Sequence, residues 1–209
     1  PRSTSTERCS PPKRPASTPD AAPPAAVIAH PVPRPLLAGD SVEVAPLLLN
    51  KLLVHGECIG RIVEVEAYRQ DDPASHSYRG RTPRTEAMFG PPGHLYVYFT
   101  YGMHWCANVV TGPDGYGAAV LLRALVPVAG EDVMRARRGG RPGVADGPAK
   151  LCQAMAIGPE HYGCDLLDDG PVRLLDDGVA PPDAPLVGPR VGISRAVDRP
   201  WRFRIPPAT

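Results

Sequence analysis

The chain has 209 residues, of which 43% are hydrophobic and 22% are charged, proportions typical of one soluble domain with a sizeable core. Its formal net charge is only +1, which excludes an overall positive field, so any nucleic-acid-binding surface must be local. No apolar run is long enough to span a bilayer, and no segment has the pattern of a signal peptide, so we expect no membrane partner.

The cysteines are scattered along the chain, and none of them forms a pair or a Cys/His cluster with metal-site spacing. We therefore expect reduced thiols in a cytosolic protein, mostly small core residues, and no bound metal. The chain has no GxGxxG or Walker loop, so we predict no nucleotide cofactor. The five cysteines are Cys9, Cys58, Cys106, Cys152 and Cys164.

Residues 1–26 differ in composition from the rest of the chain. They are mainly Pro, Ser, Thr and Ala with a few basic residues, and they include no Leu, Ile, Val or aromatic side chain. Such a segment buries too little apolar surface to offset the entropy lost on ordering. We predict a disordered, mildly basic tail without a function of its own, a non-specific DNA tether being the alternative. A single folded domain is expected over residues 27–209.

The first elements predicted in this domain are a short helix and a β-hairpin. The helix is expected within Ser41–Asn50, capped by its first residue or by Asp40. Lys51–His55 and the alternating run Arg61–Tyr68 are predicted strands, joined by a tight turn at Gly56.

The strand Arg61–Tyr68 combines an apolar face with a face of carboxylates, because successive side chains of a strand point to opposite sides. The apolar face carries Val63, Val65 and Ala67, and the other face carries Glu64, Glu66 and Tyr68. By itself this stretch favours an ordinary solvated face, since glutamates are normally exposed. The alternative is a general base beside an aromatic stacking surface.

A loop rich in arginine and hydroxyl groups is predicted over residues 71–92. Arg79, Arg81 and Arg84 form the densest positive charge in the domain, and Thr82 lies among them. Arginine, hydroxyl and backbone N–H donors together are the groups that bind phosphates. A solvated basic loop explains the pattern equally well.

The strand predicted within Gly93–Gly102 carries several tyrosines of the chain. Tyr96 and Tyr98 share one face, and Tyr101 falls on the turn that follows. A single tyrosine in a strand is usually a core residue with a satisfied hydroxyl. Three close together suggest a stacking surface.

Two further strands, His104–Val110 and Ala118–Val126, are joined by a hairpin turn predicted at Pro113–Gly117. The second strand is almost wholly apolar except for Arg123. A charge in a buried strand has to be paired with a carboxylate or to serve a function. A snorkelling residue at a sheet edge is the structural alternative, which so apolar a run disfavours.

The C-terminal part is predicted to contain two helices and short strands. Helices are expected over Glu131–Arg138 and Gly147–Gly158, the second with proline at its start and glycine at its end. Lys150 in the first turn of that helix opposes the helix dipole unless it meets an anion. Closing strands are predicted at Arg190–Ser194 and Trp201–Ile205.

Six ordered stretches carry a family resemblance. They are Gly60–Tyr68, Ala74–Ser77, Arg81–Arg84, Leu95–Met103, Leu121–Leu125 and Gly147–Ala154. Together they resemble the alkyladenine (3-methyladenine or methylpurine) DNA glycosylase family, in order and with family-like spacing from about Leu36 to Ile205. Six ordered blocks are far more specific than any one of them.

The resemblance implies an α+β fold, a single compact domain around a curved, mainly antiparallel, open-barrel-like sheet with a few short helices. It implies a monofunctional glycosylase of base excision repair that flips damaged purines out of duplex DNA and hydrolyses their N-glycosidic bond with an activated water, leaving an abasic site. The substrates implied are 3-methyladenine, 7-methylguanine, hypoxanthine and ethenoadenine.

The partners and location follow from the same resemblance. The implied partner is double-stranded DNA that contains a damaged purine, bound by a monomer without a cofactor. The expected location is the cytoplasm, with the nucleoid, if the source is bacterial, and the nucleus if it is eukaryotic.

The resemblance also gives roles to individual residues. Glu66 matches the general base, and Arg123 matches the basic residue that helps to hold this carboxylate and its water. Tyr101 matches the side chain that fills the gap left by the flipped base.

Binding contacts are implied in the same way. The base pocket is expected from Tyr68, His76, Tyr98, Asn108 and the backbone near Ala74. Phosphate contacts are expected from Arg84, Thr82, Arg81 and Lys150, with Arg84 best supported by the resemblance and Arg79 least.

The sequence departs from the family pattern in two places. The loop between Tyr68 and His76 is one residue shorter than in vertebrate-type sequences. His104 and Trp105 stand where the family has Tyr-type residues, which alters the expected pocket wall.

Two other function classes are kept as alternatives. The first is a nucleic-acid-binding module with this fold but without catalysis. The second is a sugar-active hydrolase with Glu64 and Glu66 as its acid–base pair, since alternate residues of a strand lie about 7 Å apart. This second class leaves the tyrosines and the basic loop unexplained.

Overall fold

The computed structural model describes residues 28–207, and the tail predicted for residues 1–26 lies outside this range. Its strands are β1 His30–Pro31, β2 Leu52–His55, β3 Cys58–Tyr68, β4 Leu95–Thr100, β5 His104–Val110, β6 Ala119–Ala129, β7 Val172–Asp176, β8 Leu186–Gly188 and β9 Arg202–Arg204. Its α-helices are α1 Arg34–Leu37, α2 Ser41–Leu47, α3 Glu131–Arg137 and α4 Pro148–Met155. Short 3₁₀ helices are η1 His76–Arg79, η2 Glu86–Phe89 and η3 Pro159–His161.

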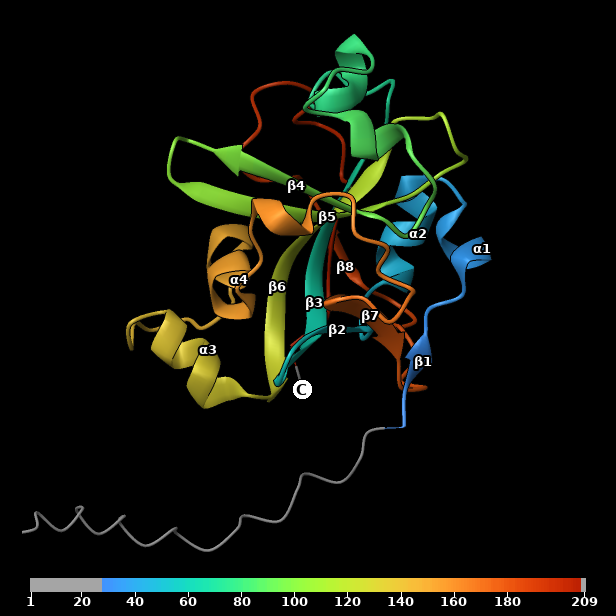
Figure 1. Ribbon diagram of the computed structural model, residues 1–209. Helices are drawn as coiled ribbons and strands as arrows, with labels where there is room; N and C mark the ends of the chain where they lie inside the picture. The colour runs from blue at the N-terminus through green and yellow to red at the C-terminus, as the bar shows by residue number, and fades with distance from the viewer. Residues whose placement is uncertain (1–27, 208–209) are drawn as a thin grey trace, which may run out of the picture.

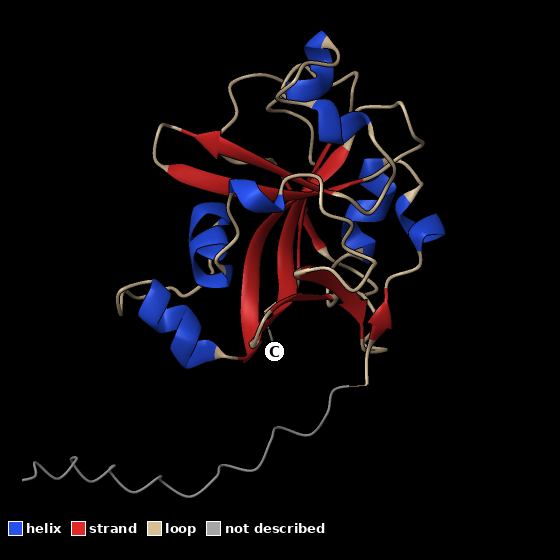
Figure 2. Ribbon diagram, in the orientation of Figure 1, coloured by secondary structure: helices blue, strands red, loops and turns tan. Residues whose placement is uncertain are grey.

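All these strands form one curled sheet flanked by short helices (Figure 1 and Figure 2). The strand order is β1-β7-β2-β3-β6-β5-β4, with β9 paired to β3 and β8 paired to β9. Every strand pair is antiparallel. The predicted α+β fold around a curved, mainly antiparallel sheet is therefore confirmed.

The long strands β3 and β6 form the spine of this sheet, and β4 and β5 run across their upper ends in Figure 1. α2 packs against β3 and β6, while α4 packs against β5 and β6. The predicted cap of α2 is confirmed, since the Val42 amide donates to Asp40 Oδ1 at 2.8 Å. These contacts fix β3 and β6 between the helices and hold the site residues that they carry.

A β-bulge interrupts the alternation that the sequence predicts for β3. Ile62 pairs with Leu125 and Glu64 pairs with the preceding residue of β6, so Val63 has no partner there. Ile62 and Val65 are both fully buried in the core as a result. The prediction that Val63 shares the core face of Val65 and Ala67 is wrong, because the pairing of β3 with β6 is irregular between Ile62 and Val65 and interrupts the alternation there.

The predicted strand at Arg190–Ser194 is also wrong. This segment is an irregular loop, and the strand that pairs with β9 is β8, which ends before Arg190. Arg190 is drawn into a fully buried ion pair with Asp72, and the next amide donates to a carboxylate. Those side-chain partners replace the ladder hydrogen bonds of a strand.

Within the described range, no helix combines the length and the apolarity needed to cross a bilayer. Four cysteines are free there, three of them buried, as predicted. They are Cys58, Cys106, Cys152 and Cys164. Cys9 lies outside the described residues.

Candidate active site

A cavity of about 770 Å³ opens where η1, the β4–β5 hairpin, β6 and the loop after β8 come together. Most residues that the sequence predicts for the site line it: Tyr68, Ala74, His76, Arg84, Tyr98, Tyr101, Asn108 and Arg123. The predicted residues that do not line it are Glu66, Arg81, Thr82 and Lys150. The structure therefore gathers the predicted aromatic residues around the cavity and leaves Glu66, Arg81, Thr82 and Lys150 outside its lining.

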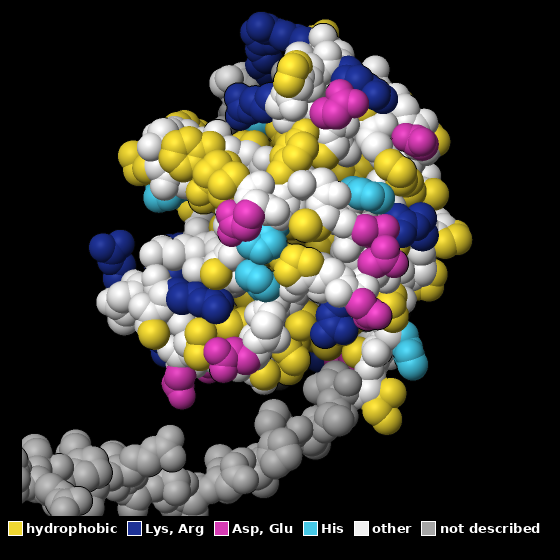
Figure 3. Space-filling model, in the orientation of Figure 1, with side chains coloured by type: hydrophobic (Ala, Val, Ile, Leu, Met, Phe, Trp, Pro, Cys, Tyr) yellow, Lys and Arg dark blue, Asp and Glu magenta, His cyan; other side chains and the backbone are white. Residues whose placement is uncertain are grey.

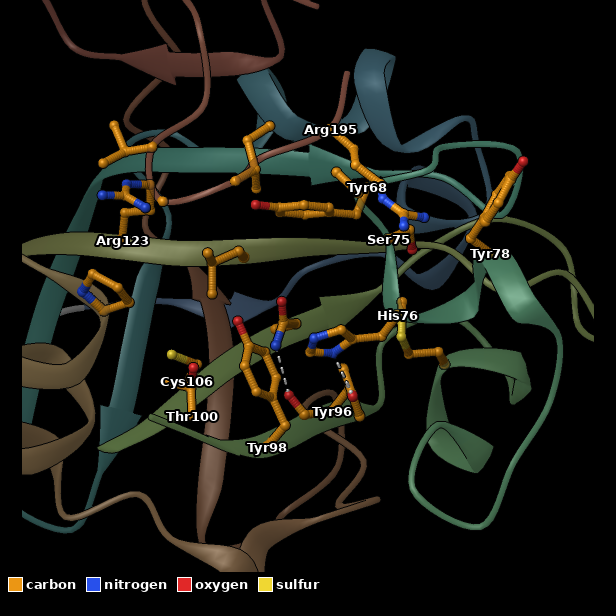
Figure 4. Close-up of a pocket in the computed structure, with 18 of the residues that line it drawn as sticks. Tyr68, Ser75, His76, Tyr78, Tyr96, Tyr98, Thr100, Cys106, Arg123 and Arg195 are labelled. Atoms are coloured by element: carbon orange, nitrogen blue, oxygen red, sulfur yellow. Dashed lines mark hydrogen bonds between the residues drawn. The ribbon is translucent and has the colours of Figure 1, made fainter. Parts of the chain in front are cut away.

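Aromatic rings form two sides of this cavity. In Figure 4 the Tyr68 ring lies opposite His76 and Tyr98, with open space between them. The His76 and Tyr98 rings meet edge to face with centroids 4.5 Å apart, and Tyr96 stacks on Tyr98 at 5.5 Å. These contacts hold the rings in place, and the gap between them has flat walls.

His76 is held as a neutral group within this wall. Its Nδ1 lies 2.9 Å from the Tyr96 hydroxyl. Partial burial of the ring, assisted by the nearby Arg84 cation, lowers the pKa of His76 to about 4. Burial raises the pKa of Tyr96 to about 12, so the phenol keeps its proton at neutral pH. His76 is therefore an uncharged hydrogen-bonding group at pH 7.

The inner end of the cavity is made by strand β5. Asn108 is buried, and its Nδ2 donates to the Tyr96 carbonyl at 3.0 Å, which fixes the orientation of its amide. Cys106, one alternate position away on the same strand, also lines the cavity, and burial raises the pKa of its thiol. Both side chains are fixed polar groups at the depth of the aromatic rings.

Glu66 lies beneath the cavity and is fully buried. Its Oε1 accepts a hydrogen bond from the Val191 amide at 2.8 Å, and its Oε2 accepts one from the Tyr68 hydroxyl at 2.9 Å. Burial and the adjacent carboxylate raise the pKa of Tyr68 well above its usual value, so this hydroxyl remains a donor. Glu66 thus reaches the cavity through residues that line it.

Arg123 joins two carboxylates of β3. Its Nη1 lies 3.2 Å from Glu66 Oε1, and its Nε donates to Glu64 Oε1 at 2.9 Å. Burial alone would lower the pKa of Arg123, but Glu66 and Glu64 outweigh it and raise the pKa further above neutrality. The prediction that a cation in so apolar a strand is paired with a carboxylate is confirmed.

The loop that follows β8 closes another side of the cavity. Its anchor is Arg190, whose guanidinium pairs with Asp72, donates to the Ala67 carbonyl at 3.0 Å and lies 4.6 Å from the centroid of the Tyr68 ring. The side chains of the ion pair are fully buried. This anchor places the Val191 amide against Glu66.

Tyr101 stands at the tip of the β4–β5 hairpin, at the mouth of the cavity. It is 77% exposed and has a φ of 50°, an unusual conformation for a residue with a bulky side chain. Gly102 follows with a φ of 66°, so both turn residues are left-handed. An exposed aromatic ring held in such a backbone conformation is typical of a functional position.

The other predicted contact residues already have partners within the chain. Arg81 pairs with Glu86 at 3.0 Å, and Lys150 pairs with Asp146 at 2.9 Å. The hydroxyl of Thr82 lies 2.9 Å from that of a neighbouring threonine. Each of these residues would have to share or exchange its partner to bind a phosphate.

The rim of the cavity carries arginines without acidic neighbours among the residues that line it. Arg79 and Arg84 come from one side and Arg195 from the other, and no ion pair to any of the three is found within residues 28–207. Figure 3 shows Lys and Arg side chains gathered over the projecting segment that contains η1. The predicted basic surface is therefore local.

Several lining residues were not predicted from the sequence. Among them are Thr100, Cys106, Leu121, Pro148 and the run 191–195. Tyr96, expected on a stacking surface with Tyr98, and His104, expected in the pocket wall, also line the cavity. The run 191–195 has no signal in the sequence, because its position depends on a buried ion pair with a distant residue.

Comparison with known proteins agrees with this geometry. A family profile described as methylpurine-DNA glycosylase (MPG) matches residues 36–208. A protein of Burkholderia cenocepacia is 54% identical over 182 residues, 84% of this chain and 87% of its own length. One of Agrobacterium fabrum is 51% identical over 176 residues (82% and 87%), and one of Methanoculleus marisnigri is 52% identical over 172 residues (78% and 89%).

These three relatives share the name "Putative 3-methyladenine DNA glycosylase". The family profile covers most of the chain, and the identities extend over more than two thirds of it. The resemblance seen in the sequence is thereby confirmed. The chain belongs to the methylpurine-DNA glycosylase family and is a DNA glycosylase.

Proposed function

We propose that this protein removes alkylated and deaminated purines, of the 3-methyladenine, 7-methylguanine, hypoxanthine and ethenoadenine class, by flipping the damaged nucleotide out of duplex DNA. The N-glycosidic bond is then hydrolysed by a water that Glu66 activates, and an abasic site remains. The observation that carries the proposal is the buried Glu66 carboxylate beneath an aromatic-walled cavity.

The size and walls of the cavity support a purine as the occupant. Its volume of about 770 Å³ lies within the ordinary range for small-molecule sites. A flat base between Tyr68 and the His76–Tyr98 pair gains stacking energy of roughly 1–3 kcal/mol per contact. Purines alkylated at N3 or N7 carry a positive charge, so a neutral His76 accepts them without repulsion.

The hydrogen bond of His76 supports a role for its other ring nitrogen. Since the Tyr96 phenol keeps its proton, it is able to donate to Nδ1. The ring proton of the neutral tautomer then resides on Nε2, which becomes a donor to an acceptor atom of the lesion. His76 is thus both a wall and a hydrogen-bond donor.

The contacts of Glu66 support a place for the reacting water. Oε1 already accepts from the Val191 amide and forms an ion pair with Arg123, whereas Oε2 accepts only from Tyr68. A carboxylate oxygen accepts about two hydrogen bonds, so Oε2 retains the capacity to take a proton from water. The same negative charge favours the oxocarbenium character that develops at C1′ as the bond breaks.

The rim supports duplex DNA as the form of the substrate. Tyr101 is exposed at the mouth of the cavity and suits the gap that an extruded base leaves. Arg79, Arg84 and Arg195 offer charges to backbone phosphates on both sides of it.

The sugar-hydrolase alternative fits the geometry less well. Glu64 and Glu66 bind the same guanidinium, so the two carboxylates lie together on one side and cannot stand on opposite sides of a glycosidic bond.

The test is single-turnover excision from duplexes that each contain one lesion, scored as abasic sites. Glu66→Gln keeps the shape of the side chain and removes the base, so excision falls by about 10²–10⁴-fold while affinity for lesion DNA is retained. Glu57→Gln makes the same change in the exposed β2–β3 turn and leaves the rate unaltered. Near wild-type excision by folded Glu66→Gln protein would contradict the proposal.

A further inference from the structure

We infer that Glu64 is a positioning residue for this reaction, because it shares Arg123 with Glu66. Glu64, Glu66 and Arg123 form a charged cluster beneath the cavity, which we call its floor, and Glu64 keeps this floor negatively charged. The inference rests on the proposed function, in which Glu66 acts on water. It assigns a role to a carboxylate that does not line the cavity.

The geometry of Arg123 is set from two sides. Its Nε donates to Glu64 Oε1 at 2.9 Å, while Nη1 lies 3.2 Å from Glu66 Oε1. Since the guanidinium is planar and its donors are fixed relative to one another, the bond at Nε determines where Nη1 points. The Arg123 side chain is 12% exposed, so little solvent competes for these donors.

The orientation of the Arg123 guanidinium limits how many oxygens of Glu66 it contacts. A guanidinium that turned both terminal nitrogens toward Glu66 would form a bidentate pair and occupy both carboxylate oxygens. With Nε committed to Glu64, Arg123 contacts only Oε1. Oε2 is left with the Tyr68 hydrogen bond alone and keeps the capacity to accept another.

The charge balance points in the same direction. Glu64, Glu66 and Arg123 together carry one net negative charge. Arg190, which lies near Tyr68, is already neutralised by the buried Asp72. A positive charge that develops at C1′ above these groups is therefore stabilised by their net negative charge, which Arg202 beside Glu64 offsets in part.

Arg202 opposes this effect from the far side of Glu64. Its Nη1 lies 3.4 Å from Glu64 Oε1, the same oxygen that binds Arg123 Nε. Arg202 thus withdraws part of the negative charge that Glu64 supplies. Removing Glu64 and removing Arg202 break the same ion pair but change the charge of the floor in opposite directions.

This opposition gives the experiment. Single-turnover excision is measured at saturating protein for Glu64→Gln and Arg202→Gln, together with the affinity of each for lesion DNA. We expect Glu64→Gln to lower the rate by roughly 10- to 100-fold, the effect of one charge a few ångströms from the reacting bond. We expect Arg202→Gln to leave the rate unchanged or to raise it, and affinity to stay within about threefold for both.

Controls separate charge from shape and from folding. Glu64→Asp keeps the charge and shortens the side chain, so it should recover most of the rate lost in Glu64→Gln and also serves if that variant folds poorly. Glu57→Gln should match the wild type. The thermal midpoint of each variant shows that the comparison is made between folded proteins.

The outcomes distinguish this inference from the proposed function. A wild-type rate in Glu64→Gln beside an inactive Glu66→Gln overturns the inference and leaves the function standing. Equal losses of rate and stability in Glu64→Gln and Arg202→Gln also overturn it, since the ion pair would then be merely structural. An active Glu66→Gln removes the function itself, whatever Glu64 does.

Discussion

The charged side chains of the floor and those of the rim differ in whether they are paired within the protein. Beneath the cavity the charged side chains are buried or half-buried and paired with one another: Glu64 and Glu66 with Arg123, and Asp72 with Arg190. At the rim the arginines that line the cavity have no carboxylate near them among its lining residues. The charges of the first region are paired with one another, whereas no ion pair to the rim arginines is found within residues 28–207.

This difference separates two tasks. Charges that are held by the fold need no rearrangement when the reaction begins, which is the condition for electrostatic stabilisation of a transition state. Charges left exposed and unpaired gain energy only from an external anion, and phosphates supply one. We therefore expect changes in the floor to affect folding and rate, and changes in the rim to affect affinity and its dependence on salt.

The largest effect on stability is expected from Asp72→Asn. The substitution leaves the fully buried Arg190 guanidinium without its counter-charge, which costs about 3–5 kcal/mol of unfolding free energy. The midpoint and slope of urea unfolding provide the measurement.

A matched control for this prediction is the neighbouring Asp71→Asn. Asp71 forms an exposed pair with Arg69, so its loss should change stability by no more than about 1 kcal/mol. Similar losses in the two variants would mean that the floor is no more dependent on its ion pairs than the surface is.

Tyr101→Ala tests the rim where it meets the base stack. Without a ring to fill the vacated space, capture of the extruded base weakens, and we expect excision from a matched duplex to fall roughly 10- to 100-fold. The loss should shrink when the lesion lies beside a gap, where extrusion is easier. Equal losses on both substrates would assign Tyr101 a structural role in the hairpin.

Arg84→Ala and Arg195→Ala test the phosphate side of the comparison. Each phosphate contact that is lost should lower the slope of log K against log salt by about 0.9, for damaged and undamaged duplex alike. Single-turnover rates at saturating protein should change little. Arg84 also donates to the Phe99 carbonyl at 3.4 Å, so Arg195 gives the cleaner measurement. An unaltered salt slope with a collapsed rate would mean that the residue supports catalysis and does not bind a phosphate.

The smallest expected effect is the pH dependence of stability caused by His76, which lies between the floor and the rim. Its pKa falls from 6.5 to about 4 on folding, so between these values the unfolded chain binds more protons than the folded one. Stability should therefore rise with pH from about 4 to 6.5 through this residue and level off above. NMR titration of the imidazole in the wild type and in Tyr96→Phe measures it directly. A titration midpoint near 6.5 in the wild type would contradict the lowered pKa of His76.

The strands of the site could be predicted because their patterns are local. Tyr96 and Tyr98 share a face by alternation alone, and the structure stacks them. Arg123 was predicted to need a carboxylate because an unpaired charge in an apolar strand is too costly. The roles of Glu66 and Tyr101 came from the ordered blocks of the family resemblance and stay predictions for these positions.

Two features of the site could not be predicted from local patterns. The bulge at Val63 changes which residues of β3 reach the core, and it depends on pairing with β6 some sixty residues later. The loop 190–195 resembles a strand in sequence, yet the energy of the Arg190–Asp72 pair decides its path. Both are decided by partners distant in the chain.

The sequence by itself determined the individual strands of the site and its aromatic and basic residues, because periodicity and composition act over a few residues and do not depend on the fold. The curved antiparallel sheet was implied by the family resemblance of the six ordered stretches. Only the tertiary structure decided that Glu66 is buried below the cavity, that Arg123 is shared, and that Val191 closes over them. These depend on which distant groups satisfy each buried charge, because a buried charge is stable only with the partner that the fold brings to it.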